Sequence, residues 1–473
     1  MKLQRMAVLS DDEIKQIHEA SLHILSHSGV KIYSKQMLRL LKEAGLDVDA
    51  DAGIARFSRE CVEDAIGSIP STFDVFGRDG AFAFTLGDGT PKVAAGHNAV
   101  FWADSDTGAT RTSTIADIEL FARLCESLHE IDVIGIPVMP QDGPDPAASL
   151  LYGVKACIEY CSKPIYFSTD KPDINRACID MIRSAFRGDM KSQVYGTTQL
   201  SPTSPLFWEE SVIEALIDSV NLGVPVAILP EPITGQSAPY TLAGLLTVDN
   251  TECLSGLVMT QLIKPGSKAL YANSWTTTDM RTGSALVGSA ETTLCRIAGA
   301  QLARFYGVPS HTTAPNSDNH AHDEQNAWEK TFSQFCSIAA GNDLIVNCGM
   351  FATGMTSSHE QLIMDDEISA MSRRIANGIT VNDATIALDL IEEIGPHGSS
   401  YLTTDHTLEW LRSDEHLMPN LAVRGPYASW KSAGSKDTYQ RARDVVHKFA
   451  SKIPIKIDAE RSRKLDDIIR DFD

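Results

Sequence analysis

The chain has 473 residues, of which 43% are apolar and 22% charged, as is ordinary for a folded protein of one large domain or a few smaller ones. Its formal net charge of −21 argues against nucleic acid and anionic membranes as partners. No apolar run is long enough to cross a bilayer, and the first residues lack the apolar stretch of a signal peptide. We therefore expect a cytoplasmic protein without membrane contact.

The first 115 residues predict an α+β extension. Three amphipathic helical patterns come first. Short alternating runs at 73–76, 82–84 and 93–95 then predict a small β meander, and residues 99–108 predict a hairpin. Further along, two of the nine cysteines, Cys157 and Cys161, are expected to be buried thiols because the sequence offers no further metal ligands near them.

From about residue 116 the sequence alternates between helical patterns and short apolar strands, which is typical of successive βα units. The clear strand candidates lie at 133–138, 164–167, 193–198, 224–229, 269–272, 308–311 and 344–347. The eighth strand has two candidates, Ser400–Leu402 and a segment near Ala99. We predict an α/β fold, a (β/α)8 TIM barrel over 116–430 with C-terminal helices over 431–473.

A doubly wound sheet is the alternative fold, but no Gly-x-Gly-x-x-Gly motif follows the first strand. In a barrel the chemistry belongs to the loops after the strands. Those loops carry many hydroxyls, amides and aromatic rings and few lysines, which suits binding a small ligand by shape and hydrogen bonds. The candidate substrate-binding residues are His97, Trp102, Tyr166, Gln199, Ser204, Glu231, Trp275, His311, Asn316, Asp318, Phe351 and His397.

Each candidate also has a purely structural interpretation. Trp275 could pack at the rim of the barrel, and Glu231 could cap a helix. His311, His320 and His322 could suggest a metal site, but their spacing matches no standard ligand pattern. The sequence contains no motif of a serine hydrolase or a zinc protease.

An ordered set of segments resembles the trimethylamine methyltransferase family over nearly the whole chain. The segments are Asp104–Arg111 with Asp117, Ser201–Leu206, Asp323–Gln325 with Glu329–Lys330, Asn347–Met355, Glu360–Glu367, Gly395–Gly398, Tyr401–Leu402 and Asp405–Thr407. The resemblance implies a (β/α)8 barrel that moves a methyl group from a methylated amine or betaine to cob(I)alamin. The cobalamin belongs to a separate corrinoid protein, so no stably bound cofactor or metal is expected.

One departure from the family pattern narrows the expected substrate. Members that use trimethylamine carry pyrrolysine near the region matching Pro315–Asp318, where this chain has only standard residues. The chain is therefore similar to the branch without pyrrolysine, which implies a quaternary amine, with glycine betaine expected first and proline betaine or carnitine as alternatives. A homo-oligomer is also expected.

The chemistry of a quaternary amine fits an enzyme without a catalytic residue of its own. The leaving group is a neutral tertiary amine that needs no proton, so the protein has to bind the cation and aim one methyl group outward. Aromatic faces, with Glu231 or Asp318, could hold the cation, and a substrate carboxylate could meet a hydroxyl, an amide, a histidine or Arg281. Two rivals are a non-catalytic betaine-binding protein and a metal-dependent hydrolase.

Overall fold

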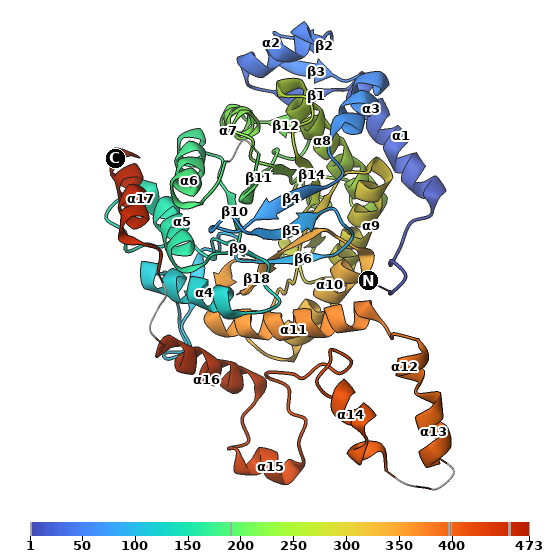
Figure 1. Ribbon diagram of the computed structural model, residues 1–473. Helices are drawn as coiled ribbons and strands as arrows, with labels where there is room; N and C mark the ends of the chain where they lie inside the picture. Colours follow the sequence, from blue (N-terminus) through green and yellow to red (C-terminus); the bar gives the residue numbers. More distant parts are fainter. Residues whose placement is uncertain (1, 190–191, 396–397, 399, 453–455, 473) are drawn as a thin grey trace.

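The computed structural model describes residues 2–189, 192–395, 398, 400–452 and 456–472. Eight parallel strands close into a barrel (Figure 1). In barrel order they are β6 (Lys92–Ala95), β9 (Val133–Gly135), β10 (Ile165–Ser168), β11 (Gly196–Leu200), β13 (Val226–Ile228), β14 (Ala269–Asn273), β17 (Ser310–Thr313) and β18 (Leu344–Cys348). The predicted (β/α)8 barrel is confirmed, and all seven clear strand candidates are barrel strands.

The eighth strand is β6, which pairs with β18 on one side and β9 on the other. Its residues 93–95 were predicted to belong to the β meander, and that part of the prediction is wrong. The candidate near Ala99 was off by only a few residues, whereas the candidate at Ser400–Leu402 is wrong because Tyr401–Thr403 forms a 3-10 turn. The barrel therefore begins inside the segment 1–115, and the division into domains otherwise stays a prediction.

Eight of the described helices surround the barrel, each following one of its strands. They are α4 (Ile115–Ser127), α5 (Ser149–Tyr160), α6 (Pro172–Ala185), α7 (Glu210–Asn221), α8 (Leu242–Ile263), α9 (Ala290–Tyr306), α10 (Glu324–Ala340) and α11 (His359–Asn377). Successive helices pack against one another, and α11 closes the ring against α4. Both predicted thiols, Cys157 and Cys161, are buried and free.

Alternate residues of the strands face two different cores. In β13, Val226 and Ile228 pack against the helices, while Ala227 and the following Leu229 belong to the cluster inside the barrel. Because a strand turns successive side chains to opposite faces, both faces are apolar in a parallel sheet covered by helices. Whether a residue is an even or an odd number of positions from an inward-facing one, called its parity below, therefore decides whether it can point into the barrel at the strand end.

The N-terminal end of the barrel is covered. A hairpin of β4 (Phe73–Phe76) and β5 (Phe82–Leu86) contributes Phe73, Val75 and Leu86 to the cluster inside the barrel. The segment before it packs α1 (Asp11–His27), α2 (Lys35–Glu43) and α3 (Arg59–Ser68) with a small sheet of β12 (Phe207–Trp208), β1 (Val30–Ile32), β3 (Ile54–Arg56) and β2 (Asp47–Asp49).

The C-terminal end of the barrel strands, called the mouth below, is flanked by two further sheets. The predicted hairpin is confirmed as β7 (Phe101–Ala103) and β8 (Thr110–Arg111), and it joins β20 (Thr356–Ser357) and β19 (Met350–Phe351). A second hairpin pairs β15 (Thr277–Asp279) with β16 (Ser284–Leu286). Both structures extend the loops in which substrate-binding residues were predicted.

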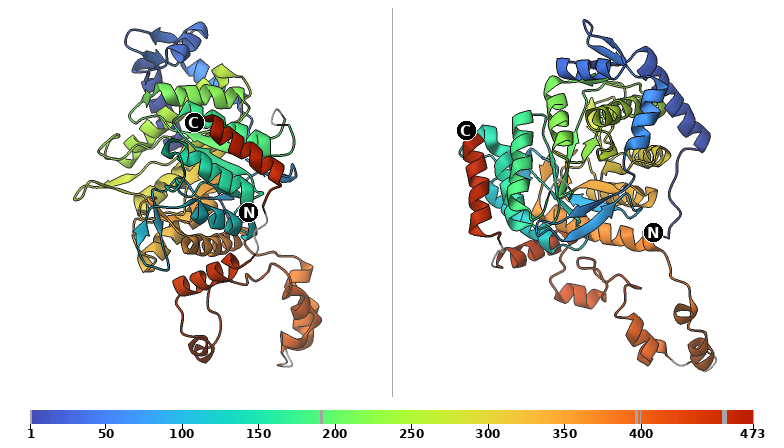
Figure 2. Two further views of the ribbon diagram at one scale, coloured as in Figure 1. Left: turned by 90° about the vertical axis from the view of Figure 1, so that its left-hand side faces the viewer. Right: turned by 45° about the horizontal axis from the view of Figure 1, so that its top comes forward.

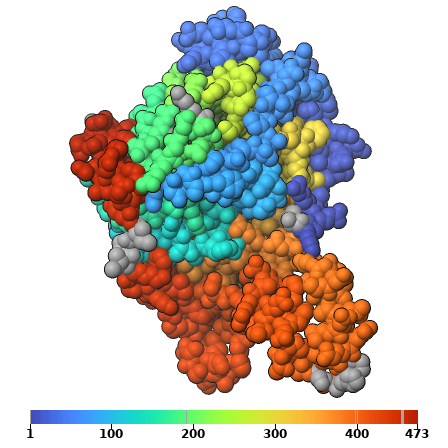
Figure 3. Space-filling model, in the orientation of Figure 1, coloured from blue at the N-terminus to red at the C-terminus, as the bar shows by residue number. Residues whose placement is uncertain are grey.

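In residues 378–436, the C-terminal arm, the described helices stand away from the barrel (Figures 2 and 3), whereas Leu421 packs into the core and its backbone N–H donates to Glu367 of α11. The arm's helices α12 (Asp383–Ile386), α13 (Leu388–Ile394), α14 (Asp405–Trp410) and α15 (Tyr427–Ser432) contain no residue described as buried. The chain returns to the barrel with α16 (Thr438–Ala450) and α17 (Ala459–Phe472). The arm exposes apolar side chains such as Leu402, and the expected homo-oligomer stays a prediction. Among the described helices, none is long and apolar enough to cross a membrane.

Candidate functional site

Polar side chains from seven of the eight strands meet at the mouth. We call them the mouth cluster, and they are His97, Tyr166, Gln199, Glu231, Ser274, His311, Thr313 and Asn347. Parity places them there: Glu231 continues the inward series of Ala227 and Leu229, and Ser274 continues that of Leu270 and Ala272. Five of the predicted substrate-binding residues thus lie together.

A stack of rings forms one wall of the cluster. Tyr166 lies almost parallel to His311 at 5.4 Å between ring centroids, and His97 meets Tyr166 edge-on at 5.6 Å. The Tyr166 hydroxyl donates a hydrogen bond to Oε1 of Gln199. Burial lowers the pKa of His97 to about 4 and that of His311 to about 3, so both rings are neutral at pH 7.

Glu231 is the acidic member of the cluster. It is exposed to solvent, and desolvation by the surrounding barrel wall raises the pKa of its carboxyl group, while a hydrogen bond from Ser274 opposes that shift. Ser274 Oγ lies 3.1 Å from Thr313 Oγ1, which accepts a hydrogen bond of 2.9 Å from Nη2 of Arg296. The buried guanidinium therefore orients two hydroxyl groups so that Ser274 donates to the carboxylate.

Asn347, at the end of β18, connects the ring stack to the next loop. Its Nδ2 donates a 2.8 Å hydrogen bond to Oδ1 of Asn316, and it also bonds His97. Its φ of 131° lies in a region that residues with a side chain rarely adopt. Such a conformation persists only where neighbouring contacts hold it, and those contacts come from the loops on either side.

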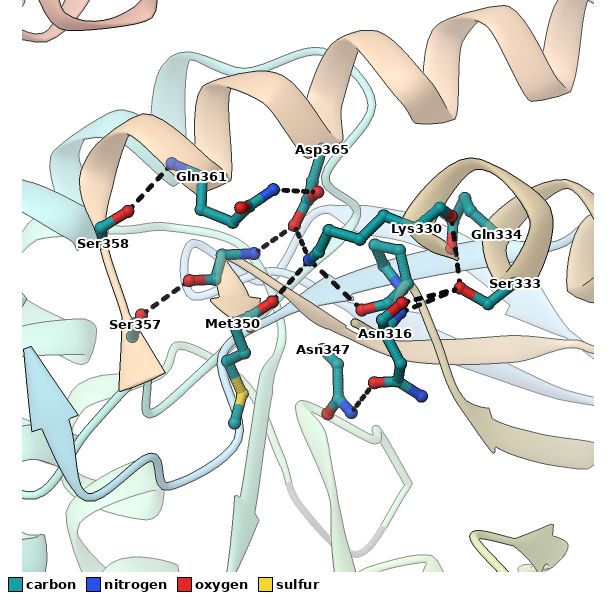
Figure 4. A network of polar contacts seen from close by, with 12 residues as sticks. Asn316, Lys330, Ser333, Gln334, Asn347, Met350, Ser357, Ser358, Gln361 and Asp365 are labelled. Carbon is teal, nitrogen blue, oxygen red and sulfur yellow. Dashed lines mark hydrogen bonds and ion pairs between the residues drawn. The ribbon is translucent and has the colours of Figure 1, made fainter. Parts of the chain in front are cut away.

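A buried ion pair holds the loops after β17 and β18 together (Figure 4). Nζ of Lys330 lies 2.7 Å from Oδ2 of Asp365, and both side chains are fully buried. The same ammonium donates to the carbonyls of Pro315 and Met350, at 3.3 and 2.5 Å. Asp365 also accepts from the backbone N–H of Gly349 at 2.7 Å. The other carboxylate oxygen of Asp365 accepts a 2.8 Å hydrogen bond from Nε2 of Gln361, so the pair positions the backbone of both loops and is itself held in place.

Other predicted residues lie in the packing outside the cluster. Trp102 is buried against Phe121 and His359, with ring centroids 6.5 and 4.6 Å away. Trp275 has the opposite parity to Ser274 and packs between the barrel and its helices, as the structural interpretation allowed. Its indole nitrogen is buried and has no described partner.

The remaining predicted residues support loops. Ser204 donates to Oε2 of Glu252 on α8 at 2.7 Å. Phe351 is buried beside His322. Asp318 accepts hydrogen bonds from the backbone N–H groups of Val287 and Gly288 at 2.9 and 3.0 Å. The predicted His397 lies outside the described residues.

Two further groups were weighed from the sequence, an arginine as a ligand for a substrate carboxylate and three histidines as metal ligands. Arg281 is an exposed residue of the β15–β16 hairpin, paired with Asp279 at 3.0 Å. The three histidines considered as metal ligands do not converge: His311 is inside the barrel, His322 stacks on Tyr439, and His320 is exposed. In the described part of the chain no three His, Cys, Asp or Glu side chains form a group that could hold a metal ion.

Comparison with known proteins gives matches over almost the whole chain. A family model described as trimethylamine methyltransferase matches residues 1–471. Trimethylamine methyltransferase MttB of Desulfitobacterium hafniense is 30% identical, covering 92% of this chain and 88% of that protein. The corresponding protein of Methanosarcina thermophila is 31% identical, covering 93% and 92%. Glycine betaine methyltransferase of Desulfitobacterium hafniense is 29% identical, covering 98% and 96%.

Among solved structures, the monomethylamine methyltransferase of Methanosarcina barkeri superposes with a TM-score of 0.52 at 13% identity. The match covers 95% of this chain and 90% of that chain, and at this identity it supports the barrel fold alone. The family model, by contrast, matches the sequence itself, over residues 1–471. The chain belongs to the trimethylamine methyltransferase family.

Proposed function

We propose that this chain transfers a methyl group from a quaternary amine to cob(I)alamin carried by a separate corrinoid protein. The observation that carries the proposal is Glu231, an exposed carboxylate at the mouth without an ion-pair partner among the described residues. An exposed carboxylate in one cluster with neutral groups, among them the half-buried imidazole of His97 and the hydroxyl of Ser274, suits a cation that cannot donate a hydrogen bond. Glycine betaine, proline betaine and carnitine are the substrates that the sequence leads us to test first.

In this reaction the chain has to bind the substrate and orient one of its methyl groups. The C–N bond to one methyl group breaks, its electron pair stays on nitrogen, and the methyl carbon bonds to the cobalt of the partner through the metal's electron pair. The leaving group is a neutral tertiary amine, so no proton has to be supplied. With the ammonium held at Glu231, the methyl group that points out of the mouth is the one accessible to the partner.

The surface around the mouth suits a partner protein. Exposed apolar side chains sit on loops that follow five different strands: Val100 and Phe101, Met139, Tyr240, Met280 and Met355. A cavity of about 530 Å³ separates Tyr240 from the β15–β16 hairpin, next to the segment that begins with Glu231. Exposed apolar side chains at one end of a barrel are typical of a surface that another protein covers during function.

The proposal is tested by mixing the protein anaerobically with each quaternary amine and free reduced cobalamin, and following methylcobalamin by its absorption spectrum. We expect methylcobalamin and one equivalent of demethylated amine. Glu231→Gln should lower the rate at least tenfold. Glu214→Gln, the same change on the exposed face of α7, should leave it unaltered. Binding by calorimetry without methyl transfer to any amine would instead support a non-catalytic binding protein.

A further inference from the structure

Among the members of the mouth cluster, Glu231 alone carries a formal charge. Glu231 is exposed, and the partly accessible members of the cluster include His97 and Ser274. Both are uncharged at pH 7, since burial keeps the imidazole of His97 neutral. A ligand that enters this space therefore meets one carboxylate and a set of neutral hydrogen-bonding groups.

The neighbouring cations are already engaged by acceptors of the protein. Arg296 is 1% exposed, and its guanidinium donates to the backbone carbonyls of Thr292 and Thr313 and to the Thr313 hydroxyl. Lys330 is fully buried in its pair with Asp365. Arg281 lines the cavity of about 530 Å³ outside the mouth cluster, where it is paired with Asp279 at 3.0 Å. In the part of the chain that the structure describes, no lysine or arginine forms an ion pair with Glu231.

We infer that this site selects quaternary amines whose nitrogen carries their only charge, and discriminates against zwitterionic betaines. The inference rests on the proposed function and revises the expected preference for glycine betaine. In glycine betaine the carboxylate is two bonds from the nitrogen, so binding the ammonium at Glu231 brings two carboxylates close together. The betaine carboxylate would also lose water without gaining a cation in return. A hydroxyl or alkyl arm has neither cost.

Choline and glycine betaine are a matched pair for the test. Both present a trimethylammonium group on a two-carbon arm, and they differ in a terminal hydroxyl against a carboxylate. In the methylcobalamin assay we expect the wild type to have a kcat/KM for choline at least tenfold above that for glycine betaine. Glu231→Gln should lower the choline value at least tenfold and bring the ratio of the two substrates close to one. Glu214→Gln should keep both values.

Three results separate failure of the inference from failure of the proposed function. If glycine betaine equals or exceeds choline in the wild type, the inference is wrong and the methyl transfer stands. A preference for choline that survives in Glu231→Gln also overturns it, because the charge would then not be its source. If choline, glycine betaine, proline betaine and carnitine all fail to methylate cobalamin, the proposed function fails, and calorimetric affinities of choline and glycine betaine for wild type and Glu231→Gln decide the charge selectivity by the same criteria.

Discussion

The two sides of the mouth are built differently. On the side of β17 and β18, Lys330 and Asp365 are fully buried. Besides their ion pair, they bond the backbone of Pro315, Gly349 and Met350 and the side chain of Gln361. On the side of β13 and β14, Glu231 is exposed and its described hydrogen-bonding neighbour is the hydroxyl of Ser274. A charge surrounded by protein donors holds a scaffold, while a charge left with few partners is available to a ligand.

The largest expected effect comes from breaking the buried pair. Lys330→Met leaves Asp365 as a buried carboxylate without a counter-charge, and Asp365→Asn leaves the buried ammonium of Lys330 without one. Removing one partner of a buried pair typically costs about 3–5 kcal/mol of unfolding free energy. We expect each variant to unfold at a clearly lower urea concentration than the wild type. The double variant Lys330→Met with Asp365→Leu should lose less unfolding free energy than either single variant.

The exposed pair between Arg281 and Asp279 provides the matched control. Arg281→Ala should leave the urea midpoint almost unchanged, because solvent screens exposed ion pairs. If Lys330→Met were as stable as Arg281→Ala, the buried pair would not hold the two loops, and the contrast between the sides of the mouth would disappear.

The barrel could be predicted largely because its strands are apolar on both faces. Seven of them read as separate apolar runs between helical patterns. Strand β6 was missed because Val93–Ala95 is short and continues the alternating pattern of the hairpin before it. Local periodicity therefore cannot show which sheet this segment joins. Its position before the first barrel helix was the available signal.

Site residues were harder to predict, because strand-end position says nothing about which way a side chain points. Parity would have separated Ser274 from Trp275: Leu270 and Ala272 face the barrel interior, so Ser274 does and Trp275 does not. Lys330 and Asp365 were visible in the family segments. They lie 35 positions apart in the sequence, on two different helices, so their pairing follows from the fold alone.

An intermediate effect is expected from acid, which tests whether the ring stack is a neutral part of the site. Burial lowers the pKa of His311 to about 3, from about 6.5 in the unfolded chain. Below about pH 6.5 the unfolded chain therefore binds a proton on this ring that the folded protein does not bind. The free energy of unfolding falls as the pH drops further. The loss is about 1.4 kcal/mol per pH unit, or about 2 kcal/mol at pH 5.

His311→Phe removes this titration and keeps a ring against Tyr166. Urea unfolding at pH 7 and pH 5 should show the variant gaining about 2 kcal/mol relative to the wild type over that interval. His129→Phe, at a side chain 97% exposed, should show no such gain. Parallel pH profiles for wild type and His311→Phe would mean that the folded protein protonates this ring as readily as the unfolded chain does.

The smallest expected effect is that of Glu231→Gln on the free energy of unfolding. It separates the two sides of the mouth most directly, because its sign is opposite to that of the changes in the buried pair. Desolvation raises the pKa of Glu231, so the folded chain binds its proton more tightly than the unfolded chain. Ionising this carboxylate at neutral pH therefore costs stability, and Glu231→Gln should be neutral to slightly stabilising at pH 7. Since water reaches the group and screens it, we expect less than about 1 kcal/mol. The gain should vanish near pH 4, where both states bind the proton.

Thermal unfolding of wild type and Glu231→Gln at pH 7 and pH 4 measures this difference. A variant that gains stability while losing methyl transfer would mark Glu231 as a group kept for ligand binding at the expense of stability. A loss comparable to that of Lys330→Met would place Glu231 with the scaffold instead. The carboxylate would then hold Ser274 and the loop after β14, and the cation would have to bind elsewhere in the mouth.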